Sequence, residues 1–357
     1  MTGRRRPEPG ELRPREAVDR YLRRRRSDST KKSVHGWEYR LKLFVEWCDS
    51  IGIERVGDLR GYDLDEYFEL RSAEIAPVTL EGEMWTLKMF CEFLEDIEAV
   101  DDGLADRVRI PDIDPEERSS DTKLDAQEAR ALLEHYRNSD SDYGTRQHVF
   151  LELAWFTGAR QGGLRALDVR DAELGENPYV MFRHRPDTET PLKNKRRGER
   201  PVALSPEVAA VVKTYLSEYR YDVNDDHGRQ PLLASATGRP TSNTVRFWSY
   251  LATIPCTYGL CPHGKTIEDC DWTARRHASK CPSSRSPHQI RTGTITWLLN
   301  RGWPPQDVAE RVNATVKTIE DHYDKATPEE RRERLRERME DRRRSLIDQL
   351  EFQKYDN

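Results

Sequence analysis

The chain has 357 residues, 36% hydrophobic and 34% charged, with a formal net charge of −5, a composition that fits two domains with separate cores. No apolar run approaches the roughly 18–20 residues needed to cross a bilayer, and no apolar stretch follows the basic N-terminus. We therefore expect a cytoplasmic protein with no membrane contact, while DNA stays possible as a partner because binding it requires only local groups of Lys and Arg.

The N-terminal part of the chain predicts a disordered segment and then a helical domain. Residues 1–14 are rich in Arg, Pro and Glu and are expected to be disordered. Residues 15–100 contain apolar side chains at steps of three and four, which indicates helices with one buried face; an example is the series Val34, Trp37, Leu41, Phe44 and Cys48. We interpret 15–100 as a small all-helical domain.

A polar segment over residues 101–122 predicts a linker between two domains. Asp, Glu, Pro and Ser dominate this segment, and the helical periodicity is lost. A capping box formed by Asp125 and Glu128 then begins a new helix. The second domain is therefore expected over residues 123–327.

This second domain is expected to combine helices with a small antiparallel sheet. Residues 179–183 and 200–204 alternate like strands, and the polar segment 186–199 between them predicts a hairpin or loop rich in Lys and Arg. Helical patterns occupy residues 242–253, 287–301, 305–312 and 315–323. The predicted fold class is mainly α, with an all-α first domain and an α+β second domain.

The C-terminal residues 328–357 predict a highly charged helix. Its apolar positions are sparse, namely Leu335, Met339, Leu346 and Leu350. They either dock on a partner or belong to a solvated tail.

Three stretches carry residues suited to chemistry on a phosphate. Gly158 ends one predicted helix and Arg160 begins the next, and an arginine at a helix N-terminus favours anions. His288 and Arg291 share one helix face, where arginine can neutralise a phosphate and histidine can donate a hydrogen bond or move a proton. Tyr323 is a poor nucleophile near its ordinary pKa of about 10 unless cations stabilise the developing charge.

A fourth stretch places lysines in the loop between the two predicted strands. Lys193 and Lys195 belong to a run of basic residues there, and a lysine on a hairpin can reach a leaving oxygen as a general acid. Each of the four stretches, taken alone, also fits ordinary surface, capping or packing residues. Their combination and order are far more specific than any one of them.

Arginine, a hairpin lysine, His-x-x-Arg and then a tyrosine, in this order, resemble the tyrosine recombinase or phage integrase family. The resemblance covers nearly the whole chain: residues 15–100 resemble that family's core-binding domain and residues 123–327 its catalytic domain. Leu164 and Leu167 match a Leu-x-x-Leu that often follows the first arginine. The resemblance implies attack of a tyrosine on a DNA phosphodiester, giving a 3′-phosphotyrosyl link and a free 5′-hydroxyl, without a metal or other catalytic cofactor.

Position by position, the resemblance assigns roles to seven residues. Arg160 and Arg291 would clamp the scissile phosphate, His288 would position it or move a proton, and Tyr323 would be the nucleophile. The leaving-group acid would be one of the two hairpin lysines, and Asn313 would donate a hydrogen bond to phosphate; the full catalytic set is Arg160, Lys193, Lys195, His288, Arg291, Asn313 and Tyr323. The implied partner is double-stranded DNA, bound by a homotetramer on two duplexes.

The sequence departs from the family pattern at two positions. Gly163 stands where the family usually has Glu or Asp three residues after the first arginine. Arg311, Val312 and Asn313 stand where the family often has Leu-Gly-His. These departures motivate an alternative in which the protein is a DNA-binding relative with impaired catalysis.

A cysteine-rich insert at residues 255–285 predicts a structural zinc site. The spacings between Cys and His suit tetrahedral zinc, and the segment is too polar to fold on a core of its own. The expected ligands are Cys261, Cys270, His277 and Cys281, with Cys256 or His263 as the alternative fourth ligand. A zinc-dependent metalloenzyme is therefore a second alternative, and a topoisomerase with the same tyrosine chemistry is a third.

Overall fold

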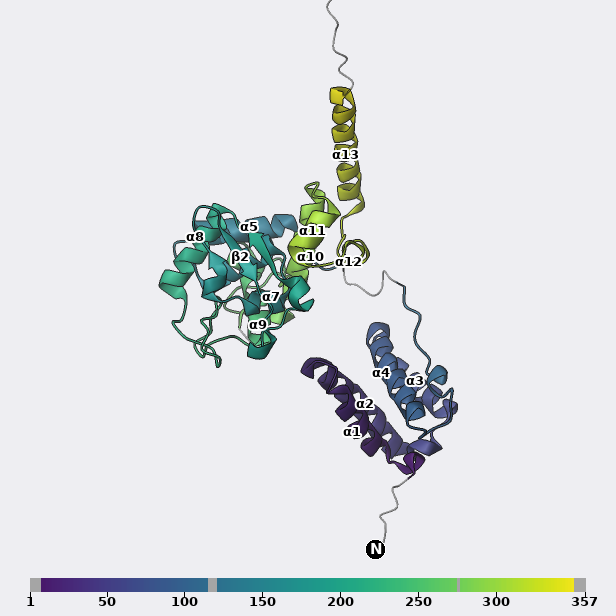
Figure 1. Ribbon diagram of the computed structural model, residues 1–357. Helices are drawn as coiled ribbons and strands as arrows, with labels where there is room; N and C mark the ends of the chain where they lie inside the picture. Colours follow the sequence, from purple (N-terminus) through teal and green to yellow (C-terminus); the bar gives the residue numbers. More distant parts are fainter. Residues whose placement is uncertain (1–7, 115–120, 275–276, 350–357) are drawn as a thin grey trace, which may run out of the picture. The chain divides into compact units, whose positions relative to one another are not determined.

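The structure of the protein is a computed structural model that describes residues 8–114, 121–274 and 277–349 (Figure 1). The chain divides into two compact units, Met1–Ser120 and Asp121–Asn357. Among the described residues, no helix is both long enough and apolar enough for a membrane span. Of the segment predicted to be disordered, residues 1–7 lie outside the described residues, whereas Pro9–Glu11 form a 3₁₀ turn.

The first unit is all-helical, as the sequence predicts. Its principal helices are α1 (Pro14–Arg25), α2 (Lys31–Ile51), α3 (Gly61–Glu74) and α4 (Pro77–Asp96). The hydroxyl of Thr30 caps α2 by accepting the Ser33 N–H, and Gly52 ends it in a left-handed conformation. The core combines aliphatic side chains with packed aromatic rings, and it extends past residue 100 because the short segment around Leu104 and Val108 packs into it.

The second unit is mainly helical and contains one small sheet. Before the sheet come α5 (Ala126–Asn138), α6 (Arg146–Thr157) and α7 (Gln161–Ala166). After it come α8 (Pro206–Thr214), α9 (Ser242–Ala252), α10 (Pro287–Asn300), α11 (Pro305–Val312), α12 (Val316–His322) and α13 (Pro328–Gln349). The predicted helices at 242–253, 287–301, 305–312 and 315–323 are confirmed to within one residue at every end.

The sheet is antiparallel, with strand order β1-β2-β3. The two predicted strands appear as β2 (Tyr179–Phe182) and β3 (Arg200–Ala203), and the sequence pattern missed the two-residue β1 (Ala172–Glu173). In the register of β2 and β3, Phe182 lies opposite Arg200. The fold class predicted from the sequence is confirmed, with the Lys/Arg-rich segment forming the β2–β3 connection.

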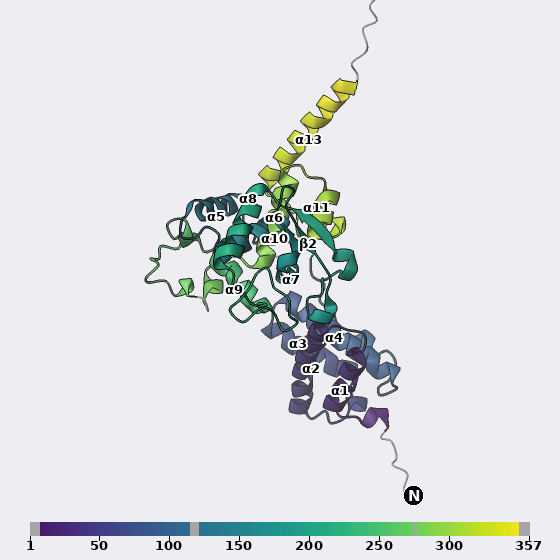
Figure 2. The same cartoon turned by 60° about the vertical axis from the view of Figure 1, so that its left-hand side comes forward.

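Helices α6 and α10 form the centre of the second unit. They pack against each other, and α6 also contacts α5, α8 and α9 (Figure 2). Thr294 on α10 donates a hydrogen bond to the carbonyl of Trp155 on α6 at 2.9 Å. A small apolar cluster joins the far half of α10 to α11 and α12, and Tyr323 belongs to it.

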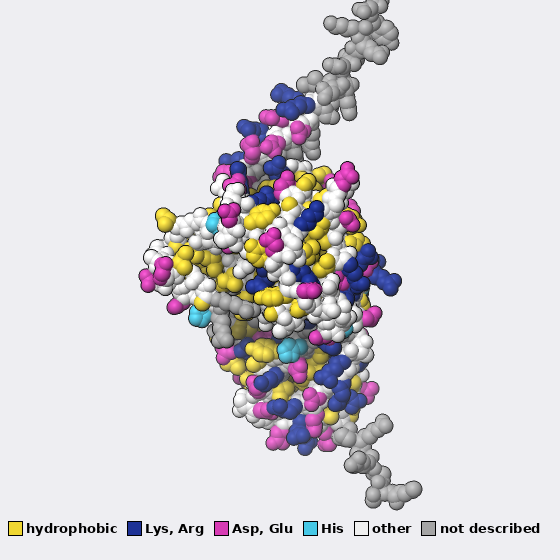
Figure 3. All heavy atoms as spheres, turned by 90° about the vertical axis from the view of Figure 1, so that its left-hand side faces the viewer, with side chains coloured by type: hydrophobic (Ala, Val, Ile, Leu, Met, Phe, Trp, Pro, Cys, Tyr) yellow, Lys and Arg dark blue, Asp and Glu magenta, His cyan; other side chains and the backbone are white. Residues whose placement is uncertain are grey.

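The first part of the charged C-terminal helix α13 contacts α10. Arg334 donates to both carboxylate oxygens of Asp324 at 2.9 Å and also to the side chain of Asn300. Lys and Arg side chains alternate with Asp and Glu along α13 (Figure 3). Leu335 and Met339 are exposed, while the Leu346 side chain and Leu350 lie outside the described residues.

We predict that Gly293→Ala destabilises the second unit by about 2–3 kcal/mol, because overpacking a tight contact forces the backbone apart. A Cβ at this position of α10 would lie 1.9 Å from the carbonyl oxygen of Leu124 and 3.1 Å from the Trp155 ring. Thermal and urea unfolding measure the loss. Gly162→Ala is the matched control, since none of the described residues brings an atom within 4 Å of its added Cβ outside the helix's own backbone and the chain neighbours. An equal loss in both variants would contradict the prediction.

Candidate active site

Arg160 is directed toward the end of α11 by the glycine that ends α6. Gly158 has a φ of +56°, and an added Cβ would lie 2.8 Å from the Val312 side chain, so glycine suits both the conformation and the space. Arg160 is the N-cap of α7, and its Nη1 donates to the Asn313 carbonyl at 2.5 Å. The predicted glycine-arginine junction is therefore a tight turn that presents the guanidinium to another part of the chain.

Arg291 is almost fully buried in α10, with 1% of its surface exposed. Its Nη1 donates to the carbonyls of Gly158 and Val312 at 2.6 and 2.7 Å, and its Nε donates to the Tyr323 hydroxyl at 3.3 Å. The Nη2 atom is buried and has no hydrogen-bond partner among the described residues. A buried cationic donor without an acceptor is costly, and a bound anion would satisfy it.

Tyr323 and His288 complete a group with Arg291. Tyr323 follows α12, is 5% exposed, and has the Arg291 guanidinium 5.1 Å from the centroid of its ring. The rings of His288 and Tyr323 have centroids 5.4 Å apart. The Thr296 hydroxyl donates to the Tyr323 carbonyl at 2.9 Å, which attaches the end of α12 to α10.

The charge at this site is positive and uncompensated. Within the described ranges, no carboxylate lies within ion-pair distance of Arg160, Arg200, Arg291 or Arg311. Burial, together with repulsion from Arg160, lowers the pKa of Arg291 to about 10, and burial with repulsion from Arg291 and Arg160 lowers that of Arg200 to about 10. Both stay protonated at neutral pH, so the site holds a net positive charge ready for an anion.

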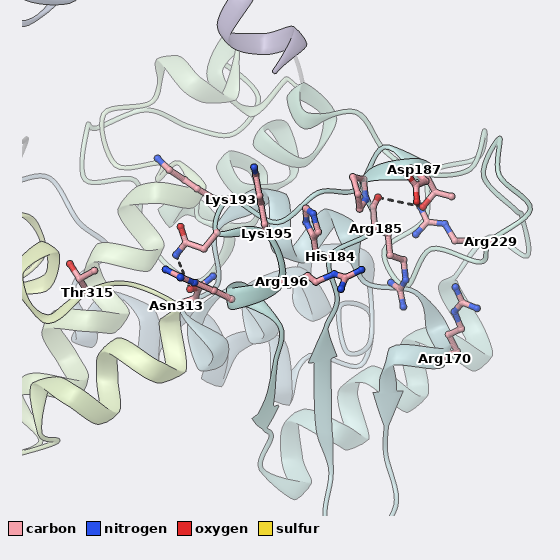
Figure 4. Close-up of a pocket in the computed structure, with 14 residues that line it drawn as sticks. Arg170, His184, Arg185, Asp187, Lys193, Lys195, Arg196, Arg229, Asn313 and Thr315 are labelled. Carbon is pink, nitrogen blue, oxygen red and sulfur yellow. Dashed lines mark hydrogen bonds between the residues drawn. The ribbon is translucent and has the colours of Figure 1, made fainter. Parts of the chain in front are cut away.

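The β2–β3 connection borders a cavity of about 1120 Å³ with mostly basic walls (Figure 4). Lys193 and Lys195 extend to the same side of the connection. Lys193 also lines a second cavity of about 20 Å³, together with Arg160 and Arg200, whereas Lys195 has a φ of +52° and begins a 3₁₀ turn. Lys193 is thus the hairpin lysine that shares a cavity with Arg160.

A buried ion network fixes the base of this connection. Asp171 accepts two hydrogen bonds from the Arg185 guanidinium, and Asp168 pairs with Arg185, Arg229 and Arg239. Arg229 also donates to the carbonyl of Thr188 at 2.9 Å inside the connection. Removal of one member of such a network would leave a buried charge without its partner.

Asn313 occupies the end of α11 in a left-handed conformation, with φ of +54°. Its carbonyl accepts the Arg160 Nη1, and its side-chain oxygen accepts the Asn194 Nδ2 at 2.9 Å. Asparagine adopts this left-handed conformation more readily than most residues other than glycine. The residue therefore contributes through its backbone and through a contact with the β2–β3 connection.

Gly163, the other departure from the family pattern, lies against the sheet. An added Cβ would lie 3.4 Å from the Phe182 ring, at ordinary contact distance. The position thus has room for a small side chain, and its carboxylate is absent from a site that contains several arginines. The consequence is a more positive pocket, not a steric one.

The predicted zinc site is not supported. Cys261, Cys270 and Cys281 each lie at a separate turn, and burial, followed by the nearby thiols, raises the pKa of Cys256. In the described part of the chain, however, no three Cys, His, Asp or Glu residues are arranged to hold a metal ion, and this includes the predicted ligand His277. The side chain of His263 instead pairs with the Ser283 hydroxyl at 3.0 Å.

The chain matches the model of the "Phage integrase family" over residues 122–330, more than half of its length. The chain belongs to the phage integrase family. It is therefore an enzyme of the tyrosine recombinase type, a class that breaks and rejoins DNA. The buried arginines and the tyrosine lie within the matched region.

This phage integrase family member is similar to a recombinase in sequence and to two integrases of known structure. A tyrosine recombinase XerC from Herpetosiphon aurantiacus is 21% identical over 252 residues, covering 70% of each chain. The Tn1549 transposon integrase in complex with a circular intermediate DNA is 14% identical, with a TM-score of 0.63 over 91% of this chain and 99% of that one. A lambda integrase dimer bound to a COC' core site is 12% identical, with a TM-score of 0.60 over 90% and 82%. These structures share the fold.

Sequence reasoning missed two arginines beside the predicted set. Arg200 donates to the Arg311 carbonyl at 2.7 Å, and Arg311 donates to the Phe156 carbonyl at 2.6 Å. The available signal was an arginine at the start of the second predicted strand. That arginine is linked to the site only by the strand register, which places the Arg200 guanidinium 4.5 Å from the centroid of the Phe182 ring.

We predict that His288 is neutral at pH 7 in the DNA-free protein. Partial burial and repulsion from Arg291 and Arg160 lower its pKa below the ordinary value of about 6.5. Arg160→Gln removes one repulsive charge and should raise that pKa. NMR titration of the imidazole Cε1 proton, assigned with His288→Gln, measures the change, and an unmoved midpoint in Arg160→Gln would refute the electrostatic coupling.

Proposed function

We propose that this enzyme cuts DNA by attack of the Tyr323 Oη on a phosphorus atom. The new bond joins the phenol oxygen to phosphorus, the bond to the 5′ oxygen breaks, and a 3′-phosphotyrosyl link forms. Rejoining reverses these steps with a 5′-hydroxyl as the attacking group. Because one ester replaces another, the energy of the phosphodiester is conserved.

The observation that carries the proposal is the buried Nη2 of Arg291, which has no partner among the described residues and lies beside the Tyr323 hydroxyl. A phosphate oxygen at this atom would bring phosphorus close to the phenol oxygen. Arg160, at the N-cap of α7, would contact the same phosphate as Arg291. The two cations would then stabilise the pentacoordinate transition state. Removal of one such preorganised donor typically costs about 10²–10³-fold in rate.

Two proton transfers accompany the reaction. His288 is assigned to accept the phenol proton, since its lowered pKa keeps the imidazole neutral. Lys193 is assigned to protonate the departing 5′ oxygen, because it shares a cavity with Arg160. Asn313 is assigned to hold Arg160 and the β2–β3 connection through its backbone and amide, and Lys195 to contact the DNA backbone.

The proposed partner is double-stranded DNA, held by a homotetramer on two duplexes. Support comes from the family resemblance and from the Tn1549 and lambda integrases, which are bound to DNA in their structures. The first unit, with the helices of residues 15–100, is proposed as the core-binding domain and residues 123–327 as the catalytic domain. Charged residues 328–357 then follow the catalytic domain.

Covalent trapping tests the nucleophile. Duplexes that the full chain retains from a random pool are first recovered, and a nick is placed beside the scissile phosphate so that the cut end diffuses away. We predict a denaturation-resistant protein–DNA adduct for the natural chain and for the exposed-tyrosine control Tyr221→Phe, and none for Tyr323→Phe, which still binds the duplex. An adduct in Tyr323→Phe would exclude the assignment, and binding without any adduct would favour the impaired relative.

A sulfur substitution identifies the general acid. A 5′-bridging phosphorothiolate leaves as a thiolate, whose conjugate thiol has a pKa near 8.5, so it needs no proton from the enzyme. We predict that Lys193→Ala slows cleavage of the ordinary duplex by about 10²–10⁴-fold and that the sulfur duplex restores it. Lys195→Ala is the matched control. If the sulfur duplex restored cleavage only in Lys195→Ala, the general acid would be Lys195 and not Lys193.

A further inference from the structure

The last three carbonyls at the end of α11 each accept a hydrogen bond from a different arginine. Arg200 donates to the carbonyl of residue 311, Arg291 to that of residue 312 and Arg160 to that of residue 313, at 2.7, 2.7 and 2.5 Å. A helix C-terminus carries a partial negative charge from such unpaired carbonyls. The helix end therefore gathers three guanidinium groups from three separate segments.

Arg200, like Arg291, is held by hydrogen bonds to two backbone carbonyls. Its Nε and Nη1 donate to the carbonyls of Arg311 and Gly198, and its Nη2 makes no hydrogen bond within the described residues. Its plane rests on the Phe182 ring, and no carboxylate pairs with it in the described part of the chain. A half-buried guanidinium that keeps one donor unused among the described residues and has cationic neighbours is suited to an anion.

A notch of about 20 Å³ lies between Arg160, Lys193 and Arg200. Roughly 10–15 Å³ of such space holds one water-sized atom, so the notch has room for a single phosphate oxygen. Gly163 also lines the notch, and the carboxylate that the family usually has at that position would have lowered its positive charge. Without it, the charge of the notch is available for an anion.

We propose that Arg200 is a third phosphate-binding arginine of the active site, which contacts a non-bridging oxygen of the scissile phosphate in this notch. The proposal rests on the proposed function, because it requires DNA cleavage at this site. Arg200 would share the negative charge of the transition state with Arg160 and Arg291. The competing role is structural, in which Arg200 only ties β3 to α11 through the Arg311 carbonyl.

Charge removal on the DNA separates the two roles. A methylphosphonate at the scissile position replaces one charged oxygen by a methyl group, so that a cation facing this oxygen is no longer needed. We compare adduct formation by the natural chain and by Arg200→Ala on the ordinary and the methylphosphonate duplex, both with the sequence recovered by selection. The expected defect of Arg200→Ala is about 10²-fold on phosphodiester and only a few-fold on methylphosphonate.

Further variants keep the test decisive if Arg200→Ala folds poorly. Arg200→Gln keeps a neutral side chain of similar length and should show the same relief on methylphosphonate, whereas Arg200→Lys keeps the charge and should retain part of the phosphodiester activity. Arg220→Ala is the matched control, since Arg220 is a buried arginine that also donates to backbone carbonyls, of Pro231 and Val223, away from the site. The defect of Arg220→Ala relative to the natural chain should be the same on the two duplexes.

Equal defects of the Arg200 variants on both duplexes, or relief only when a neighbouring phosphate is neutralised, would overturn the proposal. Absence of an adduct with the natural chain would instead reject the proposed function itself. Thermal unfolding of every variant separates loss of fold from loss of phosphate contact.

Discussion

The end of helix α11 is the feature on which the candidate site depends. Its last carbonyls accept hydrogen bonds from three arginines: Arg160 at the N-cap of α7, Arg200 on β3 and Arg291 on α10. Arginines without a paired carboxylate repel one another. Here backbone dipoles supply the attraction, so the donors are held in place while their charge is not cancelled.

The use of dipoles in place of carboxylates has a chemical consequence. A carboxylate would neutralise the site and compete with phosphate for the guanidinium donors, whereas a carbonyl occupies only the N–H group that points at it. The Nη2 of Arg291 is therefore left buried, without a partner in the part of the chain that the structure describes, and adjacent to the Tyr323 hydroxyl. Holding such donors in place costs folding energy, which is recovered when an anion binds.

The β2–β3 connection is attached to the same helix end from the other side. Its base is held by the buried pairs of Asp168 and Asp171 with Arg185, and its tip contacts Asn313 through Asn194. The lysines that the family resemblance implicates are thereby connected to the residue that accepts Arg160. A change in the connection can thus be transmitted to Arg160 through one residue, Asn313.

The sequence by itself determined the fold class, most helix positions and the order Arg160, hairpin lysine, His288, Arg291 and Tyr323. These follow from local periodicity, capping residues and side-chain chemistry, all of which act within a few residues along the chain. That order was sufficient to identify the family, which the match over residues 122–330 then established. The sequence did not determine which of these side chains contact one another.

Only the tertiary structure decided the contacts of Arg200, the pairing of the Asn313 carbonyl with Arg160 and the donor of Arg291 that lacks a partner among the described residues. Each depends on a contact between segments more than a hundred residues apart or on the β2–β3 register, and neither leaves a periodic signal. The cysteine spacing is the converse case, because it suits zinc while the turns do not arrange the thiols and His277 as a metal site. Spacing limits how close two ligands can come, but the path of the backbone between them sets where they point.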